Sequence, residues 1–303
     1  MLYDVVIIGG GPAGLSAALT LGRGRKRVLL CDAGPRRNAA AVNVNGFVTR
    51  DGITPNEFRR TAREQLGKYP NVQVRDVGIE AISGDVGAFE VSLSDGRVTA
   101  RRVILATGMV DQVPDIEGFR ALWGSGIFQC PYCHGWEVQD RRFGYLAGSP
   151  EMLGFGLLLR GWTSSVTVFT SGAFPVPSEQ REPLTRAGVT VEERAITQLV
   201  GSEGHLAQLS FADGPPVSLD VLFAHPPQRQ VSLVSALGLT LDAQGFVQVH
   251  ELHRETSRRG IYAAGDLTTR GQSAVLAAAS GMMAAAALNH ELTVELATAG
   301  ALA

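Results

Sequence analysis

The sequence is poor in charged residues and has no long run of one sign. Only 18% of its 303 residues are charged, and 27 lysines and arginines against 29 aspartates and glutamates give a formal net charge of −2. This composition gives no indication of a nucleic-acid partner or an anionic membrane surface. Hydrophobic residues make up 45% of the chain, which excludes an intrinsically disordered protein. The length is enough for one large domain or two medium ones.

Signals for export and for membrane insertion are also missing. The N-terminus passes from Met-Leu-Tyr-Asp directly into an apolar run, without the basic segment and cleavable apolar stretch of a secretory signal. The longest apolar segment, Ala274–Leu288, is interrupted by Ser280 and Gly281, and it is shorter than the about 20 residues that a transmembrane helix needs. These features predict a cytoplasmic protein with no membrane partner.

Cysteine is scarce, whereas glycine is abundant. Three cysteines cannot form a disulfide framework, but Cys130 and Cys133 form a C-x-x-C pair, which in a reducing compartment is typical of redox or metal chemistry. Cys31 lies in an apolar run and is expected to pack in the core. The 36 glycines exceed the usual share of about 7% without a G-X-Y period, and they predict many tight turns in a folded α/β protein.

Strand-like and helix-like patterns alternate along the chain, which indicates parallel sheets with crossover helices. The expected strands are Tyr3–Gly9, Val28–Asp32, Val72–Val77, Phe89–Leu93, Val103–Ala106, Phe143–Ala147, Val166–Thr170 and Ile261–Ala264. The expected helices are Gly14–Gly22, Thr54–Leu66, Met152–Leu159 and Ser273–Leu288. The β-α-β unit that begins at Phe143 matches the first one in length, so the chain is expected to repeat one dinucleotide-binding half.

The fold class expected from this order is α/β, with two Rossmann-like (three-layer ββα) domains, the second inserted into the first. Domain boundaries are expected in two polar, proline-marked stretches, Asp111–Pro114 and His225–Gln230. Residues 1–113 and 236–303 would then form the first, discontinuous domain. Residues 114–235 would form the inserted domain, which carries the C-x-x-C pair.

A glycine motif, Gly9-Gly-Gly11-Pro-Ala-Gly14, links the first strand to the first helix. In a G-x-G-x-x-G motif the first glycine allows a tight turn, the second lets the backbone approach a pyrophosphate, and the third lets helix and strand pack closely. The N-terminus of the helix offers free N–H groups and a partial positive charge to the phosphates. Asp32 ends the second strand, where its carboxylate can accept the ribose hydroxyls. The motif predicts a dinucleotide site.

The segment Cys130-Pro-Tyr-Cys133-His134-Gly135 is the candidate reactive centre. Two thiols at this spacing can close a disulfide, and because a thiolate is the attacking species, a proton acceptor is needed nearby. His134 is the immediate candidate. The readings left open are a c-type haem attachment, a zinc site that would lack its second cysteine pair, and inert structural cysteines. His250 and His253 form an H-x-x-H pair without a third ligand and are expected to be surface residues.

Two further strand ends, Val103-Ile-Leu-Ala-Thr-Gly108 and Gly260-Ile-Tyr-Ala-Ala-Gly-Asp266, complete a family pattern. Together with the N-terminal motif they resemble the pyridine-nucleotide-disulfide oxidoreductase superfamily. The order of the parts is similar to the low-molecular-weight thioredoxin reductases along essentially the whole chain, although His134 replaces the acid/base aspartate of their Cys-x-x-Cys-Asp motif. The Cys-Pro-aromatic-Cys-His-Gly form is more similar to the FAD-dependent dithiol oxidases that close disulfides in gliotoxin- and holomycin-type natural products.

The resemblance implies FAD as the cofactor and assigns the roles in the site. Cys130 would exchange with the substrate and Cys133 would pass electrons to the flavin, while Asp266 would bind the ribityl chain. Ser273 is the expected N-cap of the last helix, whose positive end favours a reduced, anionic flavin. The residues expected to bind the cofactor are Gly9, Gly11, Pro12, Ala13, Gly14, Asp32, Ala33, Arg37, Asn45, Val77, Thr107, Gly108, Asp266, Gln272 and Ser273. No metal ligands are expected.

The second nucleotide motif departs from the family pattern. The segment Leu146–Met152 stands where the resemblance implies G-x-G-x-x-A, and its three motif positions hold Ala147, Ser149 and Met152. Their side chains obstruct the close approach of a pyrophosphate, and Glu151 would repel it. After the next strand, Thr170-Ser-Gly172 replaces the His-Arg-Arg cluster that grips the 2′-phosphate of NADPH in thioredoxin reductases. The inserted domain is therefore expected to be a scaffold rather than an ordinary NADPH domain.

The leading hypothesis is a flavin-dependent dithiol/disulfide oxidoreductase that works without NADPH on a small dithiol or a protein disulfide. Its electron acceptor or donor would be O₂, a ferredoxin or a flavodoxin. The alternatives are a thioredoxin reductase driven by NADPH, ferredoxin or flavodoxin, and a non-enzymatic, flavin-bound redox sensor. The resemblance also implies a homodimer. The loops Asn43–Asp51 and Phe119–Gln129 are expected to line the pocket over Cys130.

Overall fold

The computed structural model describes residues 2–302 and divides the chain into two compact units. Unit 1 comprises Met1–Ala39, Ile53–Val110 and Gln228–Ala303, and unit 2 comprises Ala40–Gly52 and Asp111–Pro227. The boundaries expected after residues 113 and 235 thus lie after residues 110 and 227. The second boundary comes early because β15 (Val221–Ala224), the last strand of the parallel sheet of unit 2 along the chain, ends at Ala224, and Pro226 and Pro227 follow after His225.

Residues 40–52 differ most from the expected division, because the sequence analysis assigned them to the first domain. They belong to unit 2, where Ala40 packs so closely on Gly124 that a Cβ at Gly124 would overlap it. We call residues 40–52 the strap. Sequence periodicity could not have assigned the strap to either unit, since it forms no helix and no extended strand.

The sheet of unit 1 is built on a strand that is buried on both faces. β1 lies between β2 and β6, and all three run parallel. β3 extends the sheet beside β2, β17 pairs with β6 in parallel, and β4 and β5 continue from β6 as an antiparallel meander. The strands are β1 (Leu2–Ile8), β2 (Val28–Cys31), β3 (Val72–Arg75), β4 (Ile79–Ser83), β5 (Phe89–Leu93), β6 (Gly96–Leu105) and β17 (Ile261–Ala263).

Alternate residues of β1 enter two separate hydrophobic cores, because successive side chains of a strand point to opposite faces. Val6 and Ile8 belong to one core, and Val5 and Ile7 belong to the other. The helical elements of unit 1 are α1 (Pro12–Arg23), α2 (Pro55–Leu66), α7 (Ser232–Ala236), η2 (Asp266–Thr268) and α8 (Ala274–Thr298). Two short strands, β7 (Val110–Asp111) and β16 (Gln228–Arg229), pair where the chain passes between the units.

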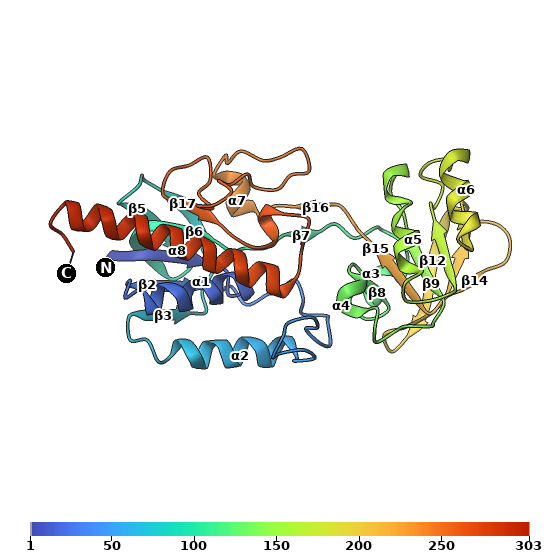
Figure 1. The fold of residues 1–303 in the computed structure, drawn as a ribbon, viewed down its shortest axis with the longest axis horizontal. Coiled ribbons are helices and arrows are strands. Elements are labelled where there is room, and N and C mark those ends of the chain that lie inside the picture. Colours follow the sequence, from blue (N-terminus) through green and yellow to red (C-terminus); the bar gives the residue numbers. More distant parts are fainter. Residues whose placement is uncertain (1, 303) are drawn as a thin grey trace. The chain divides into compact units, whose positions relative to one another are not determined.

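The α8 helix runs alongside α1 (Figure 1), and small residues let their backbones come close. A Cβ at Gly281 would overlap the backbone carbonyl of Ala13. The helix was expected to end at Leu288 but continues to Thr298, because Glu291 and Glu295 in its extra turns both pair with the fully buried guanidinium of Arg102. In residues 2–302 no helix is long and apolar enough to span a bilayer.

Unit 2 contains a second parallel sheet in the order β11-β10-β9-β15-β8 and a separate antiparallel sheet of β12, β13 and β14. Its strands are β8 (Ile127–Phe128), β9 (Phe143–Leu146), β10 (Val166–Phe169), β11 (Val189–Glu192), β12 (Ile196–Ser202), β13 (His205–Phe211), β14 (Val217–Ser218) and β15 (Val221–Ala224). Its helical elements are α3 (Phe119–Leu122), α4 (Pro131–His134), η1 (Pro150–Met152), α5 (Phe155–Leu159) and α6 (Ser178–Arg186).

The repeat expected between the two units holds for the strands but not for the helix. Instead of one helix over Met152–Leu159, a single 3₁₀ turn precedes a five-residue α5. Two glycines weaken this helix, because glycine is a poor helix former. One of them, Gly156, is needed in its place, since a Cβ there would overlap the side chain of Val168. The prediction of a matching helix was therefore wrong.

The close approach of α1 and α8 can be tested at Gly281. We expect Gly281→Ala to lower the free energy of unfolding by about 1–3 kcal/mol, the usual cost of overpacking, despite the better helix propensity of alanine. Denaturant unfolding measures this change. Gly154→Ala is the matched control, because Gly154 has a right-handed helical backbone and open space around its Cβ position. Equal stability of Gly281→Ala and wild type would contradict the close contact.

Candidate redox site and dinucleotide seats

Cys130 and Cys133 lie on one short turn of unit 2. Cys130 is the N-cap of α4 and Cys133 lies within it, and their Sγ atoms are 2.6 Å apart. A relative shift of about half an ångström would bring them to the roughly 2.05 Å of a disulfide bond. Both residues are partly exposed, whereas Cys31 is buried in the sheet of unit 1, and its burial raises the pKa of its thiol to about 12. The expectation that Cys31 is a packing residue is confirmed.

The turn makes Cys130 the more acidic thiol. A hydrogen bond from Cys133 lowers the pKa of Cys130 to about 7, against the opposing effect of burial, and the backbone N–H groups of Cys133 and Tyr132 add to the lowering. A thiolate at the start of a helical turn is stabilised by the backbone N–H groups of that turn. Cys130 is therefore a good nucleophile and a good leaving group near neutral pH.

His134 follows Cys133 in α4, and its imidazole stacks on Phe128 with 4.5 Å between ring centres. Burial lowers the pKa of His134 below its ordinary value, while Glu137 acts in the opposite direction. The ring is therefore neutral at pH 7 and has the form that accepts a proton. The role of His134 as the proton acceptor stays a prediction.

Asn45 of the strap holds the turn from outside. Its side-chain amide donates a hydrogen bond of 2.8 Å to the backbone carbonyl of Cys133. The strap is braced around Asn45, since Gly52 N–H donates to Val44 O and Gly46 N–H donates to the Asp51 carboxylate. Asn45 has this partner in the C-x-x-C turn, and its binding to the cofactor stays a prediction. This contact agrees with the expectation that the loop Asn43–Asp51 lies at Cys130.

In unit 1, the glycine motif forms the tight turn between β1 and α1. Gly9 has a left-handed φ of 112°, and a Cβ at Gly14 would overlap the carbonyl of Gly9, so helix and strand pack as closely as expected. A Cβ at Gly11, in contrast, would meet open space. The N-terminus of the twelve-residue α1, which begins at Pro12 and Ala13, is therefore accessible to a phosphate group.

Asp32 lies at the end of β2 as predicted, but two arginines that the sequence analysis did not single out contact it. The Arg59 guanidinium donates to Asp32 Oδ2 at 2.5 and 2.9 Å, and Arg63 donates to the same atom at 3.2 Å. The sequence did contain a signal for this pair, because Arg59 and Arg63 are four residues apart in α2 and therefore lie on one face of the helix. Gly10 was also missed: a Cβ there would overlap the Asp32 carboxylate.

Three of the predicted cofactor residues meet at the start of α8. Arg37 Nη1 donates to Asp266 at 2.8 Å and to Gln272 at 2.6 Å, and Gln272 exchanges two hydrogen bonds with Gln228, which the sequence analysis missed. Ser273 caps α8 by accepting a hydrogen bond from Leu276 N–H, as predicted. This end of unit 1 thus gathers the polar groups that the family resemblance assigns to a flavin.

These residues fit a flavin dinucleotide. Besides the open space at Gly11, the Oγ1 atom of Thr107 is buried and lacks a hydrogen-bond partner in the described chain. A buried hydroxyl without a partner is costly unless a bound group satisfies it. Thr107 and the adjacent Gly108 follow β6, next to β1 in the sheet. Val77, two residues after the end of β3, is buried. Ala33, which follows Asp32, is exposed.

In unit 2, the turn that follows β9 corresponds to the glycine motif of unit 1, and it carries an acidic side chain. The Glu151 carboxylate accepts hydrogen bonds from the Ser149 hydroxyl and from its own backbone N–H, and these bonds lower the pKa of Glu151. Pro150, the first residue of η1, has no N–H to offer. Ala147 is buried, and Met152 Sδ approaches the Cβ position of Gly148. An exposed carboxylate thus lies on the turn that corresponds to the pyrophosphate site of unit 1.

The segment after β10 lacks positive charge as well. Thr170 is fully buried, and Ser171 Oγ accepts a hydrogen bond from the Ile196 N–H. The arginines that follow in α6 and after β11 have carboxylate partners: Arg181 pairs with Glu193, and Arg194 makes two hydrogen bonds to Glu192. These pairs neutralise the guanidinium groups that could otherwise contact a 2′-phosphate.

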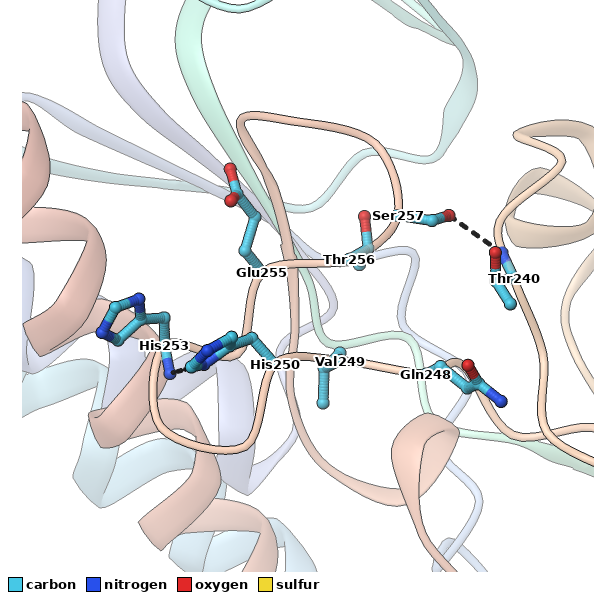
Figure 2. A pocket seen from close by; sticks show the side chains of 8 residues that line it. All are labelled: Thr240, Gln248, Val249, His250, His253, Glu255, Thr256 and Ser257. Carbon is cyan, nitrogen blue, oxygen red and sulfur yellow. Dashed lines mark hydrogen bonds between the residues drawn. The ribbon is translucent and has the colours of Figure 1, made fainter.

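A surface pocket of unit 1 contains the H-x-x-H pair (Figure 2). His250 and His253 are exposed and stacked, and His250 Nδ1 accepts the N–H groups of Leu252 and His253. The carboxylate of Glu255, in the same pocket, accepts the Gly260 N–H. No group of three metal-binding side chains occurs in residues 2–302. The two histidines are surface residues, as expected, and the pocket contains none of the predicted site residues.

The profile of the family described as pyridine nucleotide-disulphide oxidoreductase matches residues 3–281 of this chain. The chain belongs to this family. "Thioredoxin reductase tcpT" of Claviceps purpurea is 34% identical over 88% of this chain and 86% of its own length. A solved oxidoreductase from Agrobacterium tumefaciens has a TM-score of 0.90 and 39% identity, with 96% of this chain and 99% of that one covered.

A solved putative thioredoxin reductase, TrxB of Bacillus anthracis, has a TM-score of 0.91 and 34% identity, covering 97% of this chain and 99% of its own. These matches confirm the thioredoxin reductase-like class and the fold of two Rossmann-like domains. The chain is therefore a flavoprotein oxidoreductase that acts on disulfides.

The acidity of Cys130 predicts how the reduced protein reacts with an alkylating reagent. We expect the rate of iodoacetamide labelling at Cys130 to rise with pH around a midpoint near 7, because the thiolate is the reacting form. Mass spectrometry of the labelled peptide over a pH series measures this. Cys31 is the internal control and should stay unlabelled in the folded protein. A midpoint for Cys130 at the ordinary cysteine value of about 8.5 would contradict the assignment.

Proposed function

We propose that this chain is an FAD-dependent dithiol/disulfide oxidoreductase that takes electrons from a substrate dithiol without NADPH. The observation that carries the proposal is the contrast between an acidified cysteine pair within bonding reach and a second dinucleotide seat that holds its own carboxylate. Cys130 is the substrate-exchanging cysteine in this proposal, and Cys133 is the cysteine that passes electrons on.

The exchange begins with the Cys130–Cys133 disulfide. A substrate thiolate attacks Cys130 Sγ, the bond between the two cysteine sulfurs breaks, and its electron pair stays on Cys133 as a thiolate. The second substrate thiol, deprotonated, then attacks the substrate sulfur bound to Cys130, and Cys130 leaves as a thiolate. Its lowered pKa favours this second step, because a more acidic thiol is the better leaving group. The substrate loses two electrons and two protons and departs as a disulfide.

The two protons need acceptors in the site. His134 is neutral because burial lowers its pKa, and we propose that it takes a proton from the second substrate thiol. Asn45 acts as a positioning residue, since its hydrogen bond fixes the carbonyl of Cys133. A flavin held in unit 1 would supply the two-electron acceptor for the reduced cysteines, with O₂, a ferredoxin or a flavodoxin as the proposed final acceptor.

The groups proposed to hold FAD lie in unit 1. The N-terminus of α1 would receive the pyrophosphate, and Asp32 would accept the ribose hydroxyls. The Arg37–Asp266–Gln272 cluster would exchange its internal hydrogen bonds for bonds to the flavin and its ribityl chain. Thr107 would gain the partner that its buried hydroxyl lacks.

Reduction of a protein disulfide in the opposite direction is the second candidate, because curated and solved relatives carry the name thioredoxin reductase. The direction depends on the reduction potentials, and about 30 mV in a two-electron couple is worth 1.4 kcal/mol. A flavin-bound redox sensor is the third candidate, and the intact cysteine pair argues against it. Homodimer formation and a cytoplasmic location stay predictions from the sequence and the resemblance.

Anaerobic mixing of the purified yellow protein with dithiothreitol tests the proposed electron path. We expect the flavin absorbance to bleach in the wild type and expect Cys133→Ser to slow the bleaching by about 1000-fold or more, because residues of a reactive unit cannot replace each other. Stopped-flow absorbance is the measurement. Cys31→Ala is the matched control and should bleach like the wild type. Undiminished bleaching in Cys133→Ser would reject the proposal.

Mixing the same protein with NADPH under argon tests whether unit 2 binds NADPH. We expect no rapid bleaching and no rise in the melting temperature at millimolar NADPH, since the Glu151 carboxylate competes for the turn and no cationic clamp follows β10. A ligand at 100 times its dissociation constant stabilises a protein by about 2.7 kcal/mol, which thermal unfolding detects. Rapid bleaching by NADPH would identify a conventional reductase.

A further inference from the structure

Asp32 is a buried carboxylate with two arginine partners on α2. Its side chain is only 6% exposed, and both Arg59 and Arg63 form ion pairs with it. A buried carboxylate is costly unless such partners offset its charge. The sequence analysis assigned Asp32 to the ribose hydroxyls of a dinucleotide and assigned no role to the two arginines.

The two carboxylate oxygens of Asp32 have different partners. Oδ2 accepts hydrogen bonds from Nε and Nη2 of Arg59 at 2.9 and 2.5 Å and from Nη2 of Arg63 at 3.2 Å. Oδ1 accepts the backbone N–H of Gly34 at 3.0 Å. Because each oxygen of an ionised carboxylate has about two lone-pair sites, the arginines use the whole capacity of Oδ2. Oδ1 keeps a lone pair for a further donor, such as a ribose hydroxyl.

Asp32 also lies against the glycine motif of unit 1. A Cβ at Gly10 would come within 2.1 Å of Asp32 Oδ2, and Gly10 directly precedes Gly11, the N-cap of α1. An uncompensated carboxylate at this place would repel a pyrophosphate bound at the N-terminus of α1. Arg59 and Arg63 bring two positive charges to Asp32, and they offset this repulsion.

The two arginines differ in how closely they are tied to Asp32. Arg63 makes a two-point contact with Asp76, with Nη2–Oδ1 and Nη1–Oδ2 distances of 2.5 and 3.1 Å. This contact holds the pKa of Asp76 below its ordinary value and raises the pKa of Arg63. Arg59 has its two shorter contacts with Asp32 and lies 3.2 Å from Asp76. Arg59 is therefore the main partner of Asp32, and Arg63 supports it.

We propose that Arg59, supported by Arg63, is a positioning residue of the dinucleotide site. It holds Asp32 by Oδ2, so that Oδ1 accepts a hydroxyl of the adenosine ribose, and it offsets the charge of Asp32 beside the pyrophosphate. The inference rests on the proposed function, which places FAD in unit 1. Arg59 acts through Asp32 and takes no part in the exchange of sulfur bonds. Loss of its charge should therefore weaken the binding of FAD only while Asp32 is charged.

Serial dilution of the yellow holoprotein, followed by the rise in fluorescence of released flavin, measures the dissociation constant of FAD. We expect Arg59→Ala and Arg59→Gln to raise this constant by about tenfold or more. Arg59→Lys should stay within about threefold of wild type, because an ammonium group also offsets the charge, although it lacks the planar guanidinium. Arg63→Ala should have a smaller effect than Arg59→Ala, since Arg63 is shared with Asp76.

Arg60→Ala is the matched control. Arg60 lies on the same helix with an exposed side chain, and it pairs with Glu57 and Glu64 instead of Asp32. Its removal should leave the dissociation constant of FAD unchanged. Denaturant unfolding of each variant shows whether it is folded before its affinity is compared.

The Asp32→Asn background separates positioning from a role of Arg59 in the packing of α2. Asparagine keeps the shape of the side chain but carries no charge, so adding Arg59→Ala to Asp32→Asn should raise the dissociation constant by less than about twofold, because residues that act through one another are not additive. A tenfold rise in both backgrounds would show that Arg59 acts on helix packing, and it would overturn the inference. Wild-type affinity in Arg59→Ala would overturn it as well.

The outcomes also separate this inference from the proposed function. If wild type and Arg59→Ala bind FAD equally and dithiothreitol bleaches the flavin in both, the role of Arg59 is wrong and the electron path stands. If the wild-type chain takes up no FAD, the proposed function fails and the inference fails with it.

Discussion

The chemistry proposed for this chain depends on a sulfur pair that lies on one short helical turn, and a hydrogen bond from Asn45 to the carbonyl of Cys133 stabilises that turn. Cys130 is the N-cap of α4 and Cys133 lies within the helix. Their Sγ atoms are 2.6 Å apart. The turn supplies N–H groups that lower the pKa of Cys130, and Asn45 fixes the carbonyl of Cys133. Asn45 lies in the strap, 88 residues before Cys133 in the sequence, so a distant segment of the chain contributes to the geometry of the pair.

The turn after β1 in unit 1 and the turn after β9 in unit 2 differ in the charge that they present to a phosphate group. In unit 1 a twelve-residue helix begins directly after Gly11, and the space at Gly11 is open. In unit 2 a 3₁₀ turn and a five-residue α5 replace the matching helix, and the Glu151 carboxylate accepts hydrogen bonds from the Ser149 hydroxyl and from its own N–H. A backbone N–H that already donates to a carboxylate is not available to a pyrophosphate. The family fold is thus retained, while the proposed nucleotide-binding groups lie in unit 1 alone.

The sequence predicted what local patterns encode. The apolar period of β1 and β2, the Ser273 cap and the glycine motif were all visible, since each depends on residues within a few positions of one another. Long-range partners were not visible. Nothing in the spacing of Asn45 indicated Cys133, and the pairing of Asp32 with Arg59 and Arg63 needed the packing of α2. The extension of α8 to Thr298 likewise depends on Arg102, a buried residue of another element.

The most direct test of the account is a product analysis of one anaerobic turnover with an uncharged dithiol as the only reductant. The account predicts that the flavin bleaches while the dithiol is converted to its disulfide, with two electrons transferred for each disulfide formed and no pyridine nucleotide present. A flavin that stays oxidised with the dithiol, but bleaches when NADPH is added, would contradict it.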